Sequence, residues 1–355
     1  MKASHFLFLL FIIPVLSFSQ SPGMQFFHTH DGLPSDEVYT SIFDNKGYLW
    51  FATNKGVCYF DGGEFVSFSV NDGLTENTIL EVALDKKGRI WFAGLSGKLS
   101  YFEKGKIYPF SGNALIEKNK LNTEILAARS LEAIDTNEVM FNLQNGRRFH
   151  FKDSELTIFD FYHGDSLFIN KTTDRYQFYL TSDSGLTQLI LNAEFDSNTK
   201  VHFAIPYHNE RNYWLGSANY AEYDDYIIYL IEKKAFIFYR NGKVVVQNHS
   251  FIPNELLKGA WGGHWIATKN KGLIFYDSLD FSIKPIVSLL NDEIITSISY
   301  DQNNRGWVTS LMSGVYHVQS LYVTNYIPWS SYSDSYITKI IDLGDNKFLG
   351  ISKKN

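Results

Sequence analysis

The sequence predicts an all-β protein built from a unit of 41 residues that is repeated along the chain. Matching groups of Asp, Gly and Trp recur at that spacing, which is the main sign of a repeat architecture. Short runs of alternating apolar residues lie between these groups and end at turn residues, as β-strands do. The 29 Phe, 22 Tyr and 7 Trp residues also favour sheet, because aromatic side chains fit a pleated surface.

The composition excludes several classes of protein. Hydrophobic residues make up 45% of the 355 positions, which is too many for a disordered chain. Cys58 is the only cysteine, so no disulfide forms within the chain. With 32 Lys and Arg against 38 Asp and Glu, the net charge is -6, and we expect no nucleic-acid partner.

The first residues have the pattern of a secretory signal. Lys2 supplies a positive start, the apolar run Phe6–Leu16 follows, and Ser17 and Ser19 are small residues at the cleavage positions. A buried N-terminal strand or short helix is the alternative interpretation. The run has 11 residues, whereas a membrane-spanning helix needs about 20. We therefore expect a signal peptide over residues 1–19 and an exported chain.

Two adjacent copies of the repeat share their turn residues and their tryptophan. Residues 31–34 are DGLP and residues 72–75 are DGLT, and Trp50 corresponds to Trp91. Weaker copies lie towards the C-terminus, and degraded copies fill the middle of the chain. The predicted anchor positions are Trp50, Trp91, Phe141, Phe178, Trp214, Trp265, Trp307 and Phe348. Seven of them complete one circuit, and the eighth begins a further unit.

Each clear copy contains four strand signals. In the first copy, Val38–Phe43 alternates and ends at the turn Asp44–Gly47, where Gly provides a positive φ. Tyr48–Thr53, Val57–Phe60 and Phe65–Ser69 follow, each bounded by turn residues. Helical repeats need a 3.6-residue period, which these units lack. Four strands per unit are typical of a β-propeller blade, so we predict a propeller of seven four-stranded blades.

The anchor residues have a physical role in such a fold. Trp50 and Trp91 fall in the second strand of their units, where a large ring fills the wedge between neighbouring blades. Ala52 and Ala93 lie two residues further, on the same face, and leave room for a partner. One blade cannot cover both of its own faces, so the blades need neighbours and the array must close.

The start of the mature chain predicts how the ring closes. Met24–Thr29 matches Phe65–Val70 at the same offset of 41 residues, but no blade precedes it. It is therefore a fourth strand without its own first three strands. We expect it to pair with the sheet of the last blade, which removes an exposed edge.

The repeat resembles the two-component regulator propeller family. The first copy, residues 31–62, has the sequence DGLPSDEVYTSIFDNKGYLWFATNKGVCYFDG. The match is clear over residues 31–102, weaker over 260–318 and poor between about 110 and 255. Ala52 and Ala93 replace the Gly that is more common in the family. That family forms periplasmic sensor regions of bacterial two-component receptors, often two seven-bladed propellers and a small β-sandwich, followed by a membrane span and a histidine kinase.

The resemblance implies a domain organisation. We expect a propeller sensor domain over residues 20–322 and the truncated start of a further blade over residues 323–355. The receptor would be periplasmic, attached to the membrane only through a C-terminal part beyond this chain, and a homodimer is one expected assembly. The kinase would belong to that longer parent, so we expect the present chain not to be an enzyme.

Propellers usually bind ligands where loops converge at one end of the central channel. In this repeat those loops are the connections between blades and the turns between second and third strands. The candidate ligand-binding residues are Asn54, Lys55, Asn71, Asp72, Leu95 and Ser96. We expect an unidentified ligand, for which an oligosaccharide is one class.

Other polar groups in the sequence favour structural roles. His28 and His30 form a His-x-His pair without a third ligand nearby, so we expect no metal. Asp44, Asp85 and Asp301 recur at turns, where Asp accepts hydrogen bonds from its own backbone. The pair Asp224-Asp225 is expected in a solvated turn. No cofactor or nucleophile motif is present.

Three functions remain open from the sequence. The first is the periplasmic ligand-sensing propeller of a two-component signal transduction receptor. The second is a secreted propeller enzyme, a hydrolase or lyase, that acts on polysaccharide through carboxylates brought together in space. The third is a propeller that binds other proteins without a small ligand.

Overall fold

The structure is a computed structural model. It describes residues 24–318 except 122, 136, 145–146, 161–165, 173–174, 182–186, 193–203, 206–218, 232, 240–243 and 260–261, together with residues 335–342 and 348–354. The chain divides into two compact units, of which one is Met24–Gln319 and the other contains the C-terminal residues. The predicted signal peptide and Trp214 lie outside the described residues.

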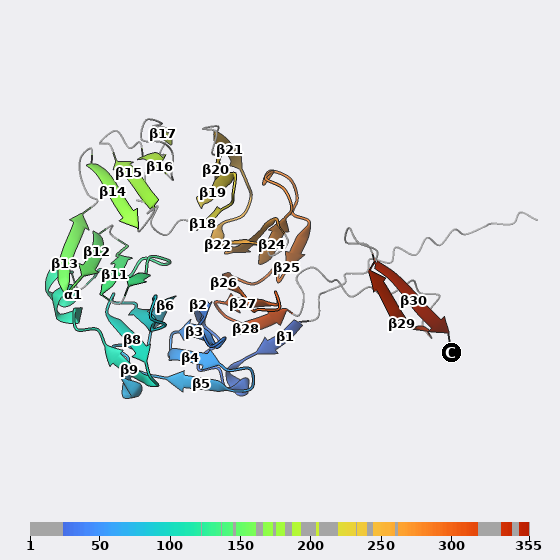
Figure 1. Ribbon diagram of the computed structural model, residues 1–355, viewed down its shortest axis with the longest axis horizontal. Coiled ribbons are helices and arrows are strands. Elements are labelled where there is room, and N and C mark those ends of the chain that lie inside the picture. The colour runs from blue at the N-terminus through green and yellow to red at the C-terminus, as the bar shows by residue number, and fades with distance from the viewer. Residues whose placement is uncertain are drawn as a thin grey trace, which may run out of the picture. The chain divides into compact units, whose positions relative to one another are not determined.

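The described part of Met24–Gln319 forms seven four-stranded antiparallel sheets (Figure 1). The first three are β2–β5 (Val38–Phe43, Leu49–Thr53, Gly56–Phe60, Phe65–Phe68), β6–β9 (Ile79–Leu84, Ile90–Gly94, Leu99–Glu103, Lys106–Pro109) and β10–β13 (Glu132–Asp135, Glu138–Asn142, Arg147–Lys152, Glu155–Asp160). The next three are β14–β17 (Ser166–Thr172, Arg175–Thr181, Thr187–Asn192, Ala204–Ile205), β18–β21 (Asn219–Glu222, Tyr226–Ile231, Lys234–Tyr239, Val244–Asn248) and β22–β25 (Pro253–Lys258, His264–Thr268, Leu273–Tyr276, Val287–Leu289). The last is β26–β27–β28–β1 (Ile295–Tyr300, Gly306–Ser310, Val315–Val318, Met24–Phe27).

The sheets are arranged around a common axis. Strand β2 lies against β6 and β26, β22 lies against β26 and β18, and β10 lies against β6. These are the first strands of their sheets, and Figure 1 shows them turned towards the centre with β5, β9 and β25 outside. The predicted all-β propeller of four-stranded blades is therefore confirmed.

Strand β1 closes this arrangement as predicted. It pairs antiparallel with β28, from Met24 opposite Val318 to Phe27 opposite Val315. The ring of Phe27 is stacked on Trp307 at 5.5 Å and reaches Phe60 in β4 at 5.3 Å. The N-terminal strand thus completes the last sheet and packs against the first one.

The repeated Asp and Trp residues build the turn between the first two strands of a blade. Asp44 Oδ1 accepts hydrogen bonds from the backbone N–H groups of Lys46 and Tyr48. Asp44 Oδ2 accepts from Trp50 Nε1 at 3.0 Å, and Asp85 accepts from Trp91 Nε1 at the same distance. The expected backbone role of these Asp residues is confirmed, and the bond to the indole adds a link to the core.

The tryptophans fill the space between blades. Trp50 is fully buried and contacts Phe92 in β7 at 5.6 Å and Phe102 in β8 at 4.8 Å. Ala52, on the same face, is also fully buried. The rings of Phe92 and Phe102 belong to the next blade, so the predicted role of Trp50 as a wedge between sheets is confirmed.

The connection between β9 and β10 differs from the pattern of the first two blades. It contains the helix α1 (Asn113–Asn119), of which Ile116 is the buried residue. The side chain of Asn113, the first residue of α1, forms two hydrogen bonds with the backbone of Leu99 in β8 and so fixes the start of the helix to the sheet. Phe141 then lies in β11, the second strand, as predicted. Among the described residues, no helix has the length and apolar character needed to cross a membrane.

The C-terminal unit contains a hairpin of β29 (Ser335–Asp342) and β30 (Phe348–Lys354). Its register shifts between Ile337 and Lys339, just as β2–β3 shifts between Val38 and Thr40 and β26–β27 after Ile295. The hairpin therefore has the backbone irregularity of the first two strands of a blade. Relative to this shift, Leu349 takes the place of Trp50, so the expected anchor Phe348 is displaced by one residue.

Candidate functional site

The first pair of predicted binding residues lies in the turn between β3 and β4. Asn54 Nδ2 donates to Glu37 Oε2 at 2.6 Å, and Glu37 Oε1 accepts from the Tyr39 hydroxyl at 2.5 Å. Burial and the adjacent Glu37 carboxylate raise the pKa of Tyr39. Lys55 is exposed beside them. The amide of Asn54 is therefore engaged by the blade, and the Lys55 side chain is presented to solvent.

The second pair occupies the equivalent turn between β7 and β8. The Ser96 backbone N–H and hydroxyl both donate to Glu76 Oε1, at 3.0 and 2.7 Å. The Leu95 N–H donates to the carbonyl of Thr78, and the Leu95 carbonyl accepts from the N–H of Leu126. This turn consequently ties its own blade to the segment that leads into the next blade.

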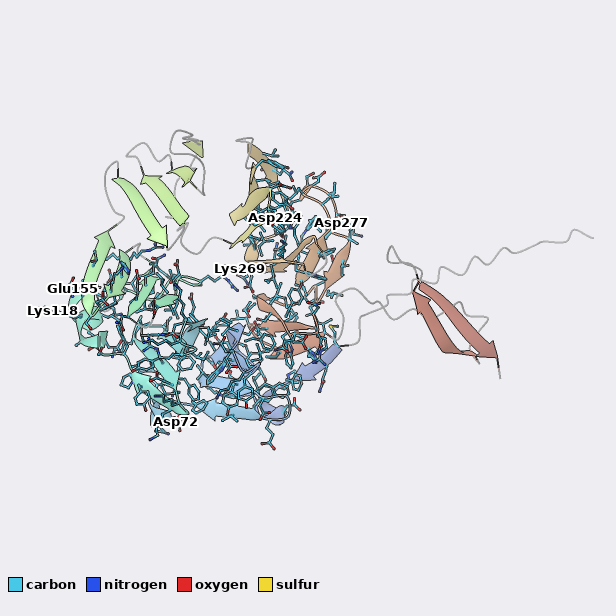
Figure 2. The ribbon with its side chains drawn as sticks, viewed as in Figure 1. Asp72, Lys118, Glu155, Asp224, Lys269 and Asp277 are labelled. Atoms are coloured by element: carbon cyan, nitrogen blue, oxygen red, sulfur yellow. The ribbon has the colours of Figure 1, made fainter. Side chains whose placement is uncertain are left out.

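The third pair does not join the other two. Asn71 and Asp72 belong to the short 3₁₀ helix η2 (Val70–Asp72), and Asp72 Oδ2 accepts hydrogen bonds from the N–H and hydroxyl of Ser69. At the next residue, Gly73, a Cβ would lie 2.6 Å from the carbonyl oxygen of Ile107 in the outermost strand β9. Figure 2 shows Asp72 at the outer edge of the unit. The expectation that all six residues converge at one end of the channel is therefore corrected, because η2 follows an outermost strand.

A polar group that joins the turn before β10 to the innermost strands β22 and β26 was not predicted. Arg129 Nη1 forms an ion pair with Glu255 Oε1 at 2.8 Å, and Arg129 Nη2 donates to the Thr296 carbonyl. The side chains of Arg129 and Glu255 are 25% and 20% exposed, so solvent reaches both. The sequence contained one signal: Glu81 and Glu255 occupy the same place in their first strands, each opposite an Ala.

Glu81 is the most perturbed carboxylate of this group. Its two oxygens accept hydrogen bonds from the N–H groups of Ser130 and Leu131 at 2.7 to 3.0 Å. Burial raises its pKa to about 7, although those hydrogen bonds and the charge of Arg129 act in the opposite direction. Burial also raises the pKa of the neighbouring Glu132. The axis therefore holds carboxyl groups that gain protons more readily than usual.

Hydroxyl groups join the first and last sheets near the axis. Ser41 Oγ in β2 lies 2.9 Å from Ser299 Oγ and 3.3 Å from Ser297 Oγ in β26. The Thr296 hydroxyl donates to the Val38 carbonyl at 2.7 Å. These bonds satisfy buried polar atoms and fix the seam that the N-terminal strand closes.

The remaining candidates have structural surroundings. His28 Nδ1 lies 3.9 Å from Asp36 Oδ1, and the residues that the structure describes contain no cluster of metal-ligating side chains. Asp224 and Asp225 are exposed in the turn after β18. Cys58 is fully buried, and burial raises the pKa of its thiol, so the nucleophilic thiolate is disfavoured.

Comparison with known families agrees with the repeat. Residues 32–55 match the family model described as two component regulator propeller. This match lies within the copy at residues 31–62 on which the resemblance was based. No match was found among curated proteins.

Several solved structures are similar in fold. The extracellular domain of the hybrid two component system BT3049 from B. thetaiotaomicron is 17% identical, with a TM-score of 0.61 over 94% of this chain and 48% of that one. The extracellular domain of the one component system BT4673 from the same organism is 16% identical. Its TM-score is 0.57, and the match covers 84% of this chain and 40% of that one. Virginiamycin B lyase from Staphylococcus aureus is 15% identical. Its TM-score is 0.57, and the match covers 84% of this chain and 99% of that one.

These similarities cover only part of the sensor structures. The chain spans about half the length of the BT3049 structure and less of the BT4673 structure. At such identities the likeness is one of fold, shared by sensor domains and by a lyase alike. The chain is a β-propeller that carries a two-component regulator propeller repeat.

Proposed function

We propose that this chain is the exported, ligand-sensing propeller of a two-component receptor and passes binding towards a membrane-linked histidine kinase. The observation that carries the proposal is the regulator propeller repeat at residues 32–55, which includes the first two strands of the sheet β2–β5. Similarity to the extracellular domain of the hybrid two component system BT3049 supports the same role. The histidine kinase and the membrane segment are proposed as parts of the complete receptor. This chain spans about half of the BT3049 structure.

The proposal includes the predicted organisation of the chain. Residues 1–19 are the signal peptide, residues 20–322 the sensor propeller and residues 323–355 the beginning of a further blade. The register shift shared by β29–β30 and β2–β3 supports the last assignment.

The proposed ligand site is the end of the propeller that carries the turns at Asn54–Lys55 and Leu95–Ser96. Lys55 is exposed there, whereas Glu37 and Glu76 hold the two turns in place. A rigid turn with an exposed cation suits recognition of hydroxyl or acidic groups on a sugar. We propose an oligosaccharide as the ligand, a periplasmic location, and a homodimeric receptor that transmits the binding event.

The experiment uses the purified mature chain and a panel of oligosaccharides. A ligand at 100 times its Kd should stabilise the fold by about 2.7 kcal/mol, which thermal unfolding detects. Lys55→Ala should abolish that shift. Lys46→Ala, an exposed lysine in the turn between β2 and β3, is the matched control and should retain it.

A second measurement separates sensing from catalysis. The same mixtures are assayed for new reducing ends or unsaturated products after long incubation. We expect none, together with ligand-dependent transcription when the complete gene is expressed in its host. Product formation would instead identify a polysaccharide hydrolase or lyase, and a shift that survives Lys55→Ala would move the site elsewhere.

A further inference from the structure

A polar connection crosses the propeller axis from the turn before β10 to the innermost strands β22 and β26. Arg129 lies in a turn before β10, and its guanidinium contacts Glu255 in β22 and the Thr296 carbonyl in β26. Around the ring, β10 is connected with β22 through β6, β2 and β26 in turn. The two ends of this contact therefore belong to sheets that are not neighbours, and the contact joins them directly.

The Arg129 end is held by a carboxylate from a third sheet. Arg129 has a φ of 59°, in the left-handed region that a residue with a side chain adopts only at a cost in free energy. The next two N–H groups, of Ser130 and Leu131, donate to Glu81 in β6. Ser130 Oγ also donates to the Ala127 carbonyl at 2.6 Å. These bonds offset the strain and aim the arginine across the axis.

The Glu255 end is held in the same way. Its Oε1 takes the guanidinium, and its Oε2 accepts a hydrogen bond from the N–H of Ile298 at 2.6 Å. Both carboxylate oxygens are therefore occupied, one by Arg129 from across the axis and one by the neighbouring strand β26. The Ile298 amide reports on this end of the connection, because it loses its partner when Glu255 moves.

We propose that Arg129 and Glu255 form a latch across the propeller axis and that Glu81 sets how firmly the latch closes. Both latch side chains are partly exposed, so the latch opens into solvent without unfolding of the blades. Closed, it makes the sheets on opposite sides of the axis move together. The latch is a conformational device and does not depend on the ligand proposed above.

Proton binding to Glu81 favours the closed latch. Close to β6, the turn before β10 carries Arg129, β10 carries Glu132 and Asp135, and β2 carries Tyr39. The strands β2, β3 and β7 contain no Asp, Glu, Lys, Arg or His. With the turn closed, burial raises the pKa of Glu81 from 4.5 to about 7. Opening the turn hydrates this carboxyl and returns its pKa towards the lower value. Because protons favour the state with the higher pKa, the latch is firmer below pH 7 than above it.

The first experiment measures hydrogen exchange of the Ile298 amide in the whole chain. Arg129→Met should speed this exchange about tenfold, as loss of one charge-assisted hydrogen bond predicts. Arg129→Met combined with Glu255→Gln should exchange no faster than the faster single variant, because both changes open one latch. Arg129→Lys, which keeps the charge, should be intermediate. Arg89→Met is the control, since Arg89 pairs with Asp85 away from the axis.

The second experiment tests the role of Glu81. Protection of the Ser130 and Leu131 amides, corrected for intrinsic rates, should fall about tenfold between about pH 5.5 and about pH 8. Glu81→Gln, which mimics the protonated carboxyl, should remain protected at both pH values. Glu76→Gln, at a turn held by a different carboxylate, should keep the wild-type pH dependence.

Contrary results are defined for both experiments. An unchanged Ile298 rate in Arg129→Met, or additive effects in the double variant, would overturn the latch. Protection that rises with pH, or a pH dependence that survives Glu81→Gln, would overturn the role of Glu81. Near-ultraviolet circular dichroism at pH 7 confirms that each variant is folded, and Arg129→Lys provides the test if Arg129→Met does not fold.

Discussion

Closure by the N-terminal strand predicts a large difference between two adjacent phenylalanines. Phe27 is 9% exposed and packs against Trp307, Phe60 and Phe65 at ring distances of 5.5, 5.3 and 5.6 Å. Phe26, the preceding residue, is 46% exposed and contacts Tyr316 in the same sheet. Because neighbouring side chains on a strand point to opposite faces, Phe27 reaches the first blade and Phe26 faces away from it.

The magnitudes follow from burial. Phe27→Ala removes a buried ring and should cost about 3–5 kcal/mol of unfolding free energy. Phe26→Ala removes an exposed ring that contacts Tyr316 and His28 and should cost about 1 kcal/mol. A unit of about 300 residues has an unfolding entropy near 0.6 kcal/mol/K, so the melting temperature should fall by about 5–8 °C and about 2 °C, respectively.

The assay is calorimetry of both variants beside the wild type, with urea unfolding as a second measure. The strand itself is retained in each variant, so the comparison isolates the packing across the closure. Equal losses for the two substitutions would refute the reasoning, because they would show that the last blade does not use Phe27 to hold the first.

Four further outcomes are expected. Gly56→Ala places a Cβ 2.1 Å from a carbonyl oxygen of β5, at a φ of 112°. Gly62→Ala has a similar φ of 105° but no atom within 4 Å of its Cβ. Calorimetry should therefore show that Gly56→Ala is less stable than Gly62→Ala by at least about 2 kcal/mol. Asp44→Ala leaves the two backbone donors and the indole of its turn without an acceptor and should cost about 1–3 kcal/mol in urea unfolding; a neutral effect would contradict the role of the turn. The Cys58 thiol should not react with a thiol reagent at pH 8 until the chain unfolds, and rapid native labelling would disagree with its burial. Burial lowers the pKa of His264 to about 4, so stability should fall as the pH drops from 6.5 towards 4, by up to about 3 kcal/mol, and His264→Asn should lose that part of the pH dependence.

The helix α1 illustrates a limit of local sequence patterns. The segment Asn113–Asn119 has seven residues and buries Ile116 alone, so it lacks the repeated apolar stripe from which a helix is predicted. The regular spacing of turns also breaks there, since the turn that contains Arg129 precedes the first strand of the third sheet, β10. Irregular segments of this kind are determined by the neighbours they pack against.

The chain itself determined the repeat, the strand order and the closing strand. Turn residues such as Asp44 and Gly47 act within a few positions, and Trp50 recurs 41 residues later as Trp91, so both can be recognised without a structure. Met24–Phe27 was identified in the same way, as a copy of β5 that lacks its own blade.

Only the tertiary structure decided which polar groups meet. Arg129 and Glu255 belong to different repeats and occupy no shared motif, and their contact depends on a turn that a third residue, Glu81, holds in place. The structure also moved Asn71 and Asp72 to the outer edge, because a connection between blades starts at an outermost strand. A repeat period describes positions along the chain. Contacts across the axis depend instead on where each blade lies around the ring, which the period does not give.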